Sequence, residues 1–287
     1  MLSINTNSAA LSAQRNVAGS QSAMAQSVQR LSSGMRVNTA KDDAAGLAIA
    51  TRLEAQSRGF SAAVRNANDG ISLLQVTDSA MSSISDSLQR MRELAVQASS
   101  GTNGTSDIAN LQTEFKQLAD EVNLIASGAK FNGVTLLGAA ATTVQVGADS
   151  GDTRSVAITN DITAAVSATA GTAGGVDTTG LAFYTATAAA VTSADADAAL
   201  SAIDNAFTDL NTARAEVGSH MSKFDRIVSD LAVKIENTES AKGRIMDADY
   251  AVETAKLSRN QILQQAGTAM LAQANAMPQS VLSLLRG

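Results

Sequence analysis

The sequence of 287 residues has no cysteine, no tryptophan and a single proline, Pro278. No disulfide can therefore stabilise the fold, and the absence of cysteine fits either side of a membrane. Aromatic residues make up 3% of the chain, which is poor material for an aromatic-lined ligand pocket. The only histidine, His220, excludes a zinc site built on several histidines.

Positive charge and long apolar runs are also scarce. The net charge of −6 argues against nucleic acid or an anionic membrane surface as the main partner. No run of about 18 apolar residues is present to cross a bilayer, so we expect no membrane insertion. The first 20 residues lack the basic and apolar regions of a cleavable signal peptide, which by itself indicates a cytosolic protein.

No catalytic or cofactor motif emerges. A Ser-His-Asp hydrolase would have to use His220, which lies within a helical pattern beside Met221. Residues 247–258 fail as a calcium loop because Val252 stands where glycine is needed and Ser258 replaces the closing glutamate. The glycines form no phosphate-binding motif. We therefore expect no catalytic residues, no metal site and no cofactor, and hence no enzyme.

What the sequence does contain is a heptad pattern in three stretches, in which apolar residues alternate at spacings of three and four. The first predicts a helix over 104–129, with Ile108, Leu111, Phe115, Leu118, Val122 and Ile125. The second predicts one long helix over 200–238, with Leu200, Ile203, Phe207, Leu210, Val217, Met221, Phe224, Val228, Leu231 and Ile235, interrupted by Arg214 and Thr238. The third is looser, with Leu74, Met81, Ile84, Leu88 and Met91.

These stretches predict a mainly α fold, a long antiparallel helical bundle of coiled coils. The segment SSGTNGTSD at 99–107 is the expected turn before the first of them, with its helix cap between Thr105 and Asp107. In the middle of the chain, Val144 and Val146 alternate with polar residues before the turn GADSGD. This pattern predicts a small β-hairpin region.

Both chain ends carry apolar residues at helical spacing. They predict two amphipathic terminal helices that pair with each other, whose apolar tail needs partners to bury it. The residues of this pattern are Met24, Val28 and Leu31 near the amino end, and Leu263, Met270, Met277, Val281, Leu284 and Leu285 near the carboxyl end. Polar joints at 38–46 and 243–251 separate these helices from the bundle. Asp42 and Asp43 there are expected to cap the helix that follows.

Several long blocks resemble the terminal regions of bacterial flagellin. They are RLSSGMRVNTAKDDAAGLAIATRL at 30–53, NANDGISLLQVTDSAM and LQRMRELAVQASSGTN within 66–103, FNGVTLL at 131–137, and QILQQAGTAMLAQANAMPQSVLSLL at 261–285. The resemblance covers both flanks, about four-fifths of the chain, and leaves out the centre.

The resemblance implies a structural subunit that polymerises into the helical flagellar filament used for motility. The terminal helices would fold as coiled coils on assembly and line its inner tube, so the nine apolar residues of the chain ends are assigned to inner-tube packing. It also implies a secreted, extracellular protein that passes unfolded through the flagellar type III export machine, which replaces the cytosolic interpretation. Implied partners are other copies of the chain, a secretion chaperone, the export gate, and the filament cap and junction proteins.

The resemblance further assigns a partner surface on the bundle, used between protofilaments and by the innate flagellin receptor of vertebrates. The matching residues are Gln89, Arg90, Arg92, Leu94, Gln97 and Glu114.

Three domains are expected: inner-tube terminal helices (1–42 with 249–287), an outer-tube helical bundle (43–138 with 196–248), and a short variable β-hairpin and surface segment (139–195). Two alternative functions stay open at this point. One is a flagellar filament-junction protein, and the other is a surface module that binds a glycan or receptor through the central segment.

Overall fold

The computed structural model describes residues 7–137, 141–156 and 193–284, with Ser193 and 277–284 described by their backbone alone. The chain forms two compact units, Met1–Ser57 with Glu236–Gly287, and Arg58–Ile235. Both boundaries between the units lie inside long helices. The three-domain division expected from the sequence stays a prediction.

Helices dominate the described residues, which confirms the mainly α fold. They are α1 (Ser8–Ser33), α2 (Ala44–Ser99), α3 (Thr105–Gly128), α6 (Ser193–Met246) and α7 (Tyr250–Leu284). The strands are short: β1 (Lys130–Phe131), β2 (Val134–Thr135), β3 (Thr142–Gln145) and β4 (Thr153–Val156).

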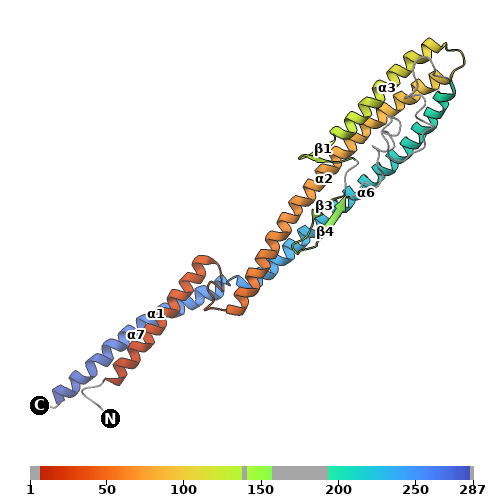
Figure 1. Ribbon diagram of the computed structural model, residues 1–287. Coiled ribbons are helices and arrows are strands. Elements are labelled where there is room, and N and C mark those ends of the chain that lie inside the picture. The colour runs from red at the N-terminus through yellow and green to blue at the C-terminus, as the bar shows by residue number, and fades with distance from the viewer. Residues whose placement is uncertain (1–6, 138–140, 157–192, 285–287) are drawn as a thin grey trace. The chain divides into compact units, whose positions relative to one another are not determined.

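In the Arg58–Ile235 unit, α2, α3 and α6 lie side by side as a bundle (Figure 1). The turn at 100–104 reverses the chain, so α3 runs antiparallel to α2. Polar contacts set α6 antiparallel to α2 as well. Early positions on α6 meet late positions on α2: Ser99 Oγ donates to Asp197, Arg92 pairs with Asp204 at 2.9 Å, and Asp78 pairs with Arg214 at 3.0 Å.

The core of this unit follows the three heptad stretches. Every one of their residues is either buried or packed against the buried cluster; the largest fully buried side chains include Phe115, Phe224, Leu74, Met81, Ile84, Leu88, Met91, Ile203 and Leu210. Arg214, a polar residue in the α6 pattern, is accommodated because its guanidinium reaches the Asp78 carboxylate. The predicted coiled-coil seams of the bundle are confirmed.

Helix starts depart from the sequence prediction in one case. The N-cap of α3 is Gly104, not a residue between Thr105 and Asp107. The Asp107 carboxylate accepts a hydrogen bond from the Gly104 N–H at 3.3 Å, so Asp107 acts from the first turn and is not itself the cap. At α2 the prediction for Asp43 is confirmed, since its Oδ1 accepts from the Gly46 N–H at 2.8 Å.

Two antiparallel hairpins follow α3. In the first, Phe131 pairs with Val134 across a tight turn in which Asn132 and Gly133 both have positive φ, 49° and 81°. That geometry is typical of the Asn-Gly hairpin turn.

The second hairpin pairs Thr142–Gln145 with Thr153–Val156, which confirms the hairpin expected around Val144. Asn66 of α2 donates to the Gln145 carbonyl at 3.1 Å and so ties this hairpin to the bundle.

In the other unit, α1 and α7 run side by side and antiparallel (Figure 1). The α1 helix begins at the N-cap Asn7, whose side chain accepts from the Ala10 N–H, and ends at Gly34 in the left-handed conformation. Gly34 allows the chain to turn, and a β-bridge between Met35 and Asp247 then joins the segments that follow α1 and precede α7. The expected pairing of the two terminal helices is therefore present.

Candidate functional site

The α1–α7 pair meets along a heptad seam, defined here as the positions that are least exposed on each helix. On α7 the seam consists of Glu253, Leu257, Asn260, Gln264, Gly267, Leu271 and Ala274. On α1 it consists of Ala10, Ala13, Val17, Ser20, Met24, Ser27 and Leu31. Both sets alternate at spacings of three and four, which is the coiled-coil pattern. Small residues at many positions let the two backbones approach closely.

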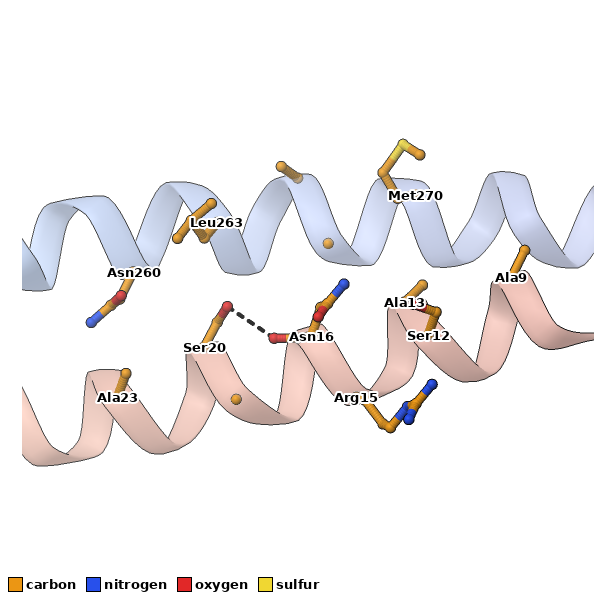
Figure 2. Close-up of a pocket in the computed structure, with 13 residues that line it drawn as sticks. Ala9, Ser12, Ala13, Arg15, Asn16, Ser20, Ala23, Asn260, Leu263 and Met270 are labelled. Atoms are coloured by element: carbon orange, nitrogen blue, oxygen red, sulfur yellow. Dashed lines mark hydrogen bonds between the residues drawn. The ribbon is translucent and has the colours of Figure 1, made fainter.

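One such close approach is at Gly267. A Cβ atom added there would lie 2.7 Å from Cγ2 of Val17, which is closer than two carbon atoms can pack. Near the end of the pair, the Asn7 side-chain amide donates to the Ala274 carbonyl at 2.7 Å. One flank of the pair carries an open groove of about 790 Å³, lined largely by alanine, serine and glycine (Figure 2).

Several large apolar side chains of this unit lie outside the seam and are exposed. Leu263 is 50% exposed and Met270 is 63% exposed, one heptad apart at the rim of the groove. In Figure 2, Met270 points away from α1. Leu11, Val28 and Ile262 are exposed as well. The α1–α7 pair therefore presents an apolar surface that the described part of the chain does not cover.

The sequence-predicted residues of the chain ends separate into two groups. Met24 and Leu31 are partly buried in the seam, whereas Val28, Leu263 and Met270 are exposed. Leu263 and Met270 thus lie outside the contact between α1 and α7, which the heptad of Glu253, Asn260, Gly267 and Ala274 occupies instead. Their assignment to inner-tube packing stays a prediction. Met277, Val281 and Leu284 lie in the last turns of α7, where only the backbone is described, and Leu285 lies outside the described residues.

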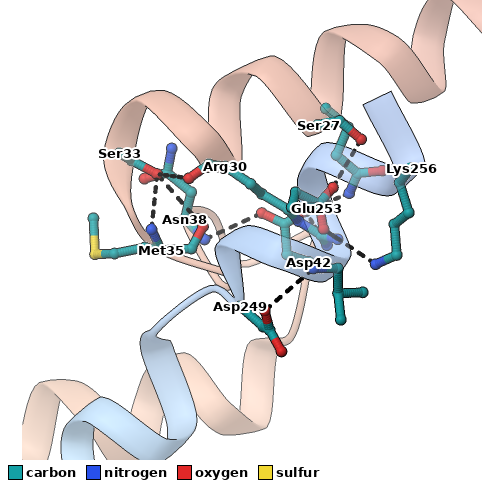
Figure 3. A network of polar contacts seen from close by, with 11 residues as sticks. Ser27, Arg30, Ser33, Met35, Asn38, Asp42, Asp249, Glu253 and Lys256 are labelled. Carbon is teal, nitrogen blue, oxygen red and sulfur yellow. Dashed lines mark hydrogen bonds and ion pairs between the residues drawn. The ribbon is translucent and has the colours of Figure 1, made fainter. Parts of the chain in front are cut away.

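A buried polar cluster closes the other end of the pair (Figure 3). Ser27 Oγ donates to Oε1 of Glu253 at 2.7 Å, and Lys256 Nζ lies 3.1 Å from Oε2 of the same carboxylate. Arg30 stands between Glu253 and Asp42, with nitrogen-to-oxygen distances of 4.0 and 3.9 Å. Glu253 is only 5% exposed.

The electrostatics of this cluster favour the ionised carboxylate. Burial by itself raises the pKa of Glu253, but the Ser27 hydrogen bond and the Lys256 and Arg30 charges outweigh burial and hold the pKa below its ordinary value. The pKa of Asp42 is lowered by hydrogen bonds from the backbone and hydroxyl of Thr39. Asp42 thus stabilises the turn after α1 and does not cap α2, which corrects half of the capping prediction.

Comparison with known proteins decides the family. The helical region at the N-terminus of bacterial flagellins matches residues 4–142, and their C-terminal helical region matches residues 200–285. A flagellin of Xenorhabdus nematophila is 40% identical over 309 aligned residues, with 99% of each chain covered. The chain belongs to the bacterial flagellin family.

Other flagellins agree along their whole length. That of Halalkalibacterium halodurans is 40% identical, and the flagellar filament 33 kDa core protein of Treponema phagedenis is 37% identical, each with 99% of both chains covered. A crystal structure of Bacillus cereus flagellin is 31% identical, covering 58% of this chain and 88% of that one, with a TM-score of 0.47. This flagellin is accordingly a structural subunit of the extracellular flagellar filament. The comparisons do not favour the junction protein or the binding module.

The partner surface assigned to the flagellin bundle is mostly exposed. Arg90 on α2 contacts Glu114 on α3 through Nε at 3.0 Å and Nη2 at 2.8 Å, and Glu93 through Nη1 at 2.9 Å. A shallow groove of about 500 Å³ beside them is lined by Gln89, Arg92, Glu93, Val96 and Gln97. Leu94 is the exception: its side chain is 1% exposed and belongs to the bundle core, so the prediction that it forms part of the surface is wrong.

Sequence reasoning missed the Ser27–Glu253 pair. A signal was present, because Glu253, Asn260, Gly267 and Ala274 are seven residues apart and repeat as regularly as the larger Leu263 set. Heptad patterns are ordinarily recognised by large apolar residues, so a heptad of small and polar residues does not stand out in the sequence.

Neither a metal-ligand cluster nor a membrane-spanning helix is present among the described residues. No group of three or more histidine, cysteine, aspartate or glutamate side chains is placed to hold a metal ion there. No helix in that part of the chain is long and apolar enough to span a membrane.

Proposed function

We propose that the exposed apolar side chains of α1 and α7 are the surface through which copies of this flagellin pack against one another in the filament. The observation that carries the proposal is that the two faces of α7 differ in composition and exposure. The α7 positions that face α1 across the seam are mostly small or polar, apart from Leu257 and Leu271. Leu263 and Met270, one heptad apart, stay at least half exposed.

The energetics favour burial of this surface by a neighbour. Fully burying a leucine or methionine side chain contributes about 1.5–3 kcal/mol. Leu11, Val28, Ile262, Leu263 and Met270 are each half exposed or more, so every copy added to a filament can bury this apolar surface. The same heptad continues to Met277 and Leu284 in the sequence, which extends the proposed surface toward the chain end. Burial on assembly would also offset the ordering of the chain ends.

Proposals about the remaining partners rest on family membership. Before assembly the apolar terminal helices need protection, which a secretion chaperone would supply, and the chain would leave the cell unfolded through the type III export gate. With no cysteine and one proline, neither disulfide exchange nor slow prolyl isomerisation retards refolding outside. Filament cap and junction proteins would contact the same terminal surface, and the innate flagellin receptor would contact the Arg90 surface of the bundle.

Seeded polymerisation tests the main proposal. Changing Leu263→Asp and Met270→Asp together should reduce the yield of sedimenting polymer at least tenfold, because each aspartate would place an unpaired carboxylate in a dry contact between copies. The circular dichroism of the monomer should not change, since both side chains lie outside the seam.

The matched control is Leu263→Met with Met270→Leu, which keeps the apolar area and should polymerise like the parent chain. Normal filaments from the double aspartate variant would show that the surface between copies lies elsewhere.

A further inference from the structure

The α1–α7 seam buries very little that can determine its register. Among the described side chains of the two helices, only Ser27, Glu253 and Ala274 are buried. In most coiled coils, large apolar residues inserted into matching holes fix one alignment of the helices. Here alanine, serine, glycine, asparagine and glutamine fill more than half of the seam, so sliding one helix by a heptad exchanges small residues for one another.

Besides the Tyr250 hydroxyl, which donates to the Leu31 carbonyl, two polar contacts join the helices along this seam: Ser27 with Glu253 and Asn7 with Ala274. The residues of each helix are 20 and 21 positions apart, which at about 1.5 Å per residue places both contacts in one continuous antiparallel alignment. The Asn7 contact does not select that alignment, because its acceptor is a backbone carbonyl and every residue offers one. Glu253, in contrast, is the only carboxylate among the α7 seam positions.

A slide of one heptad in either direction takes Glu253 away from the Ser27 hydroxyl or the Arg30 guanidinium that it now contacts without an equivalent replacement for both. In one direction Glu253 moves opposite Ser20, and Ala23 then takes the place of Arg30. In the other direction it moves opposite Gly34, which has no side chain to donate. Lys256 travels with Glu253 on the same helix and so does not distinguish the alignments. The first slide keeps a serine hydroxyl opposite Glu253 but removes the Arg30 cation, and the second slide removes the hydroxyl donor. A buried carboxylate that loses either partner is disfavoured.

We propose that Ser27 and Glu253, together with Arg30, set the register of the α1–α7 pair. The register in turn decides where Val28 on α1 stands relative to Leu263 and Met270 on α7, and therefore the pattern of apolar side chains offered to a neighbouring copy. These three polar residues are positioning residues for polymerisation, and this role rests on the function proposed above. A buried polar contact that selects one alignment of a coiled coil is the physical precedent.

The structure supplies a direct reporter of the register. The Cβ of Val17 lies 3.9 Å from a Cβ built on Gly267, within the range of about 3.5–4.5 Å found in disulfides. The chain contains no cysteine, so the Val17→Cys/Gly267→Cys pair would hold its only thiols. A disulfide between them reports the observed alignment. Val17→Cys with Asn260→Cys, or with Ala274→Cys, reports a slide of one heptad in either direction.

The experiment places Ser27→Ala or Glu253→Ala in each cysteine background and measures disulfide formation and seeded polymerisation of the full chain. The parent should form the Val17–Gly267 cross-link and neither shifted one. Glu253→Ala should form shifted cross-links at a level comparable with the native one and should raise the critical concentration at least tenfold. Ser32→Ala, an exposed serine near the end of α1, is the matched control and should behave like the parent.

Oxidation supplies the decisive comparison. A preformed Val17–Gly267 disulfide should restore polymerisation of Glu253→Ala to within about threefold of the oxidised parent, because the covalent bond replaces the lost register contact. It should not restore Leu263→Asp, whose defect lies between copies. The proposal is overturned if Glu253→Ala polymerises normally, if it forms the native cross-link alone, or if the disulfide gives no rescue.

Failure of the underlying function would look different. If the oxidised parent, without any further change, did not polymerise while its reduced form did, the α1–α7 pair would not be the arrangement present in the filament.

Discussion

Arg90 on α2 and Glu114 on α3 are joined side by side, with Nη2 of the guanidinium 2.8 Å from Oε1 of the carboxylate. The hydrogen bond with Glu114, followed by that with Glu93, raises the pKa of Arg90. The cation is thus held in a fixed direction at the surface although it is 51% exposed. A partner that binds this surface would contact the Arg90 guanidinium, which is held between the Glu93 and Glu114 carboxylates.

Reversing this charge should separate recognition from folding. Arg90→Asp would set a carboxylate beside Glu93 and Glu114, and we expect at least a tenfold loss of receptor activation by the monomer in a reporter assay. The melting temperature should change little, because exposed ion pairs contribute little to stability. Arg226→Asp, on an exposed position of α6, is the control and should remain active. Full receptor activation by Arg90→Asp would show that the receptor does not contact the Arg90 surface.

Acid should weaken the α1–α7 pair through Glu253. The groups that face this carboxylate are Arg30 from α1 and Lys256 from α7, with Asp42 on the far side of Arg30. Because the pKa of Glu253 is lowered from 4.5 in the folded state, its stabilising contribution is complete above that value. The contribution is lost as the pH falls through the lower folded pKa.

We therefore expect filaments to dissociate as the pH falls below about 4.5. Dissociation can be followed by light scattering across the pH range. Glu253→Gln keeps the side chain's size and its acceptor oxygen but has no charge to lose, so its acid sensitivity should be smaller. An unchanged pH midpoint in this variant would show that other carboxylates control dissociation.

The bundle core makes a separate prediction. Phe115 on α3 is 0% exposed, and Phe115→Ala should lower the free energy of unfolding of the Arg58–Ile235 unit by about 3–5 kcal/mol. Leu124→Ala on the same helix is the control, because Leu124 is 70% exposed and its truncation should change stability by less than about 0.5 kcal/mol. Urea unfolding monitored by circular dichroism measures both. Equal effects would contradict the assignment of the α3 seam.

The bundle was predictable from the sequence because its seam residues are large. Phe115, Leu210 and Phe224 recur at heptad positions, and a large apolar residue at such spacing is almost always buried. Alternation of apolar and polar residues likewise identified the hairpin around Val144. It did not identify the tight turn at Asn132 and Gly133. The predicted N-cap of α3, between Thr105 and Asp107, differs from the observed Gly104 by at least one residue. Several polar residues near a helix start can each accept hydrogen bonds from its first N–H groups, so the sequence does not specify which one does.

At the chain ends the same reasoning identified the apolar face of α7 but not the face that contacts α1. Leu263 and Met270 are the largest residues at heptad spacing on α7, yet the seam is built on Glu253 and Gly267. Size indicates burial only when the chain itself provides the covering surface. In the proposed packing, other copies cover the apolar face, so a single sequence does not distinguish that face from the one that contacts α1.

The final prediction contrasts two glycines of the α1–α7 pair, Gly19 in α1 and Gly267 in α7. Alanine is favoured over glycine inside a helix by about 1 kcal/mol, and this gain applies to both positions. A Cβ at Gly19 meets no atom within 4 Å, whereas at Gly267 it would lie 2.7 Å from Cγ2 of Val17. Valine is restricted to essentially one rotamer in a helix and cannot turn its methyl group away, so the backbones would have to separate.

The same substitution should therefore act with opposite signs. Gly19→Ala should raise the temperature at which the α1–α7 pair loses its helical circular dichroism, and Gly267→Ala should lower it. Adding Val17→Ala to Gly267→Ala removes the overlapping methyl group and should recover most of the loss, which a general effect on helix formation would not do. If Gly267→Ala stabilised the pair as much as Gly19→Ala, α1 and α7 would not approach each other at Val17, and the seam assigned here would be out of register.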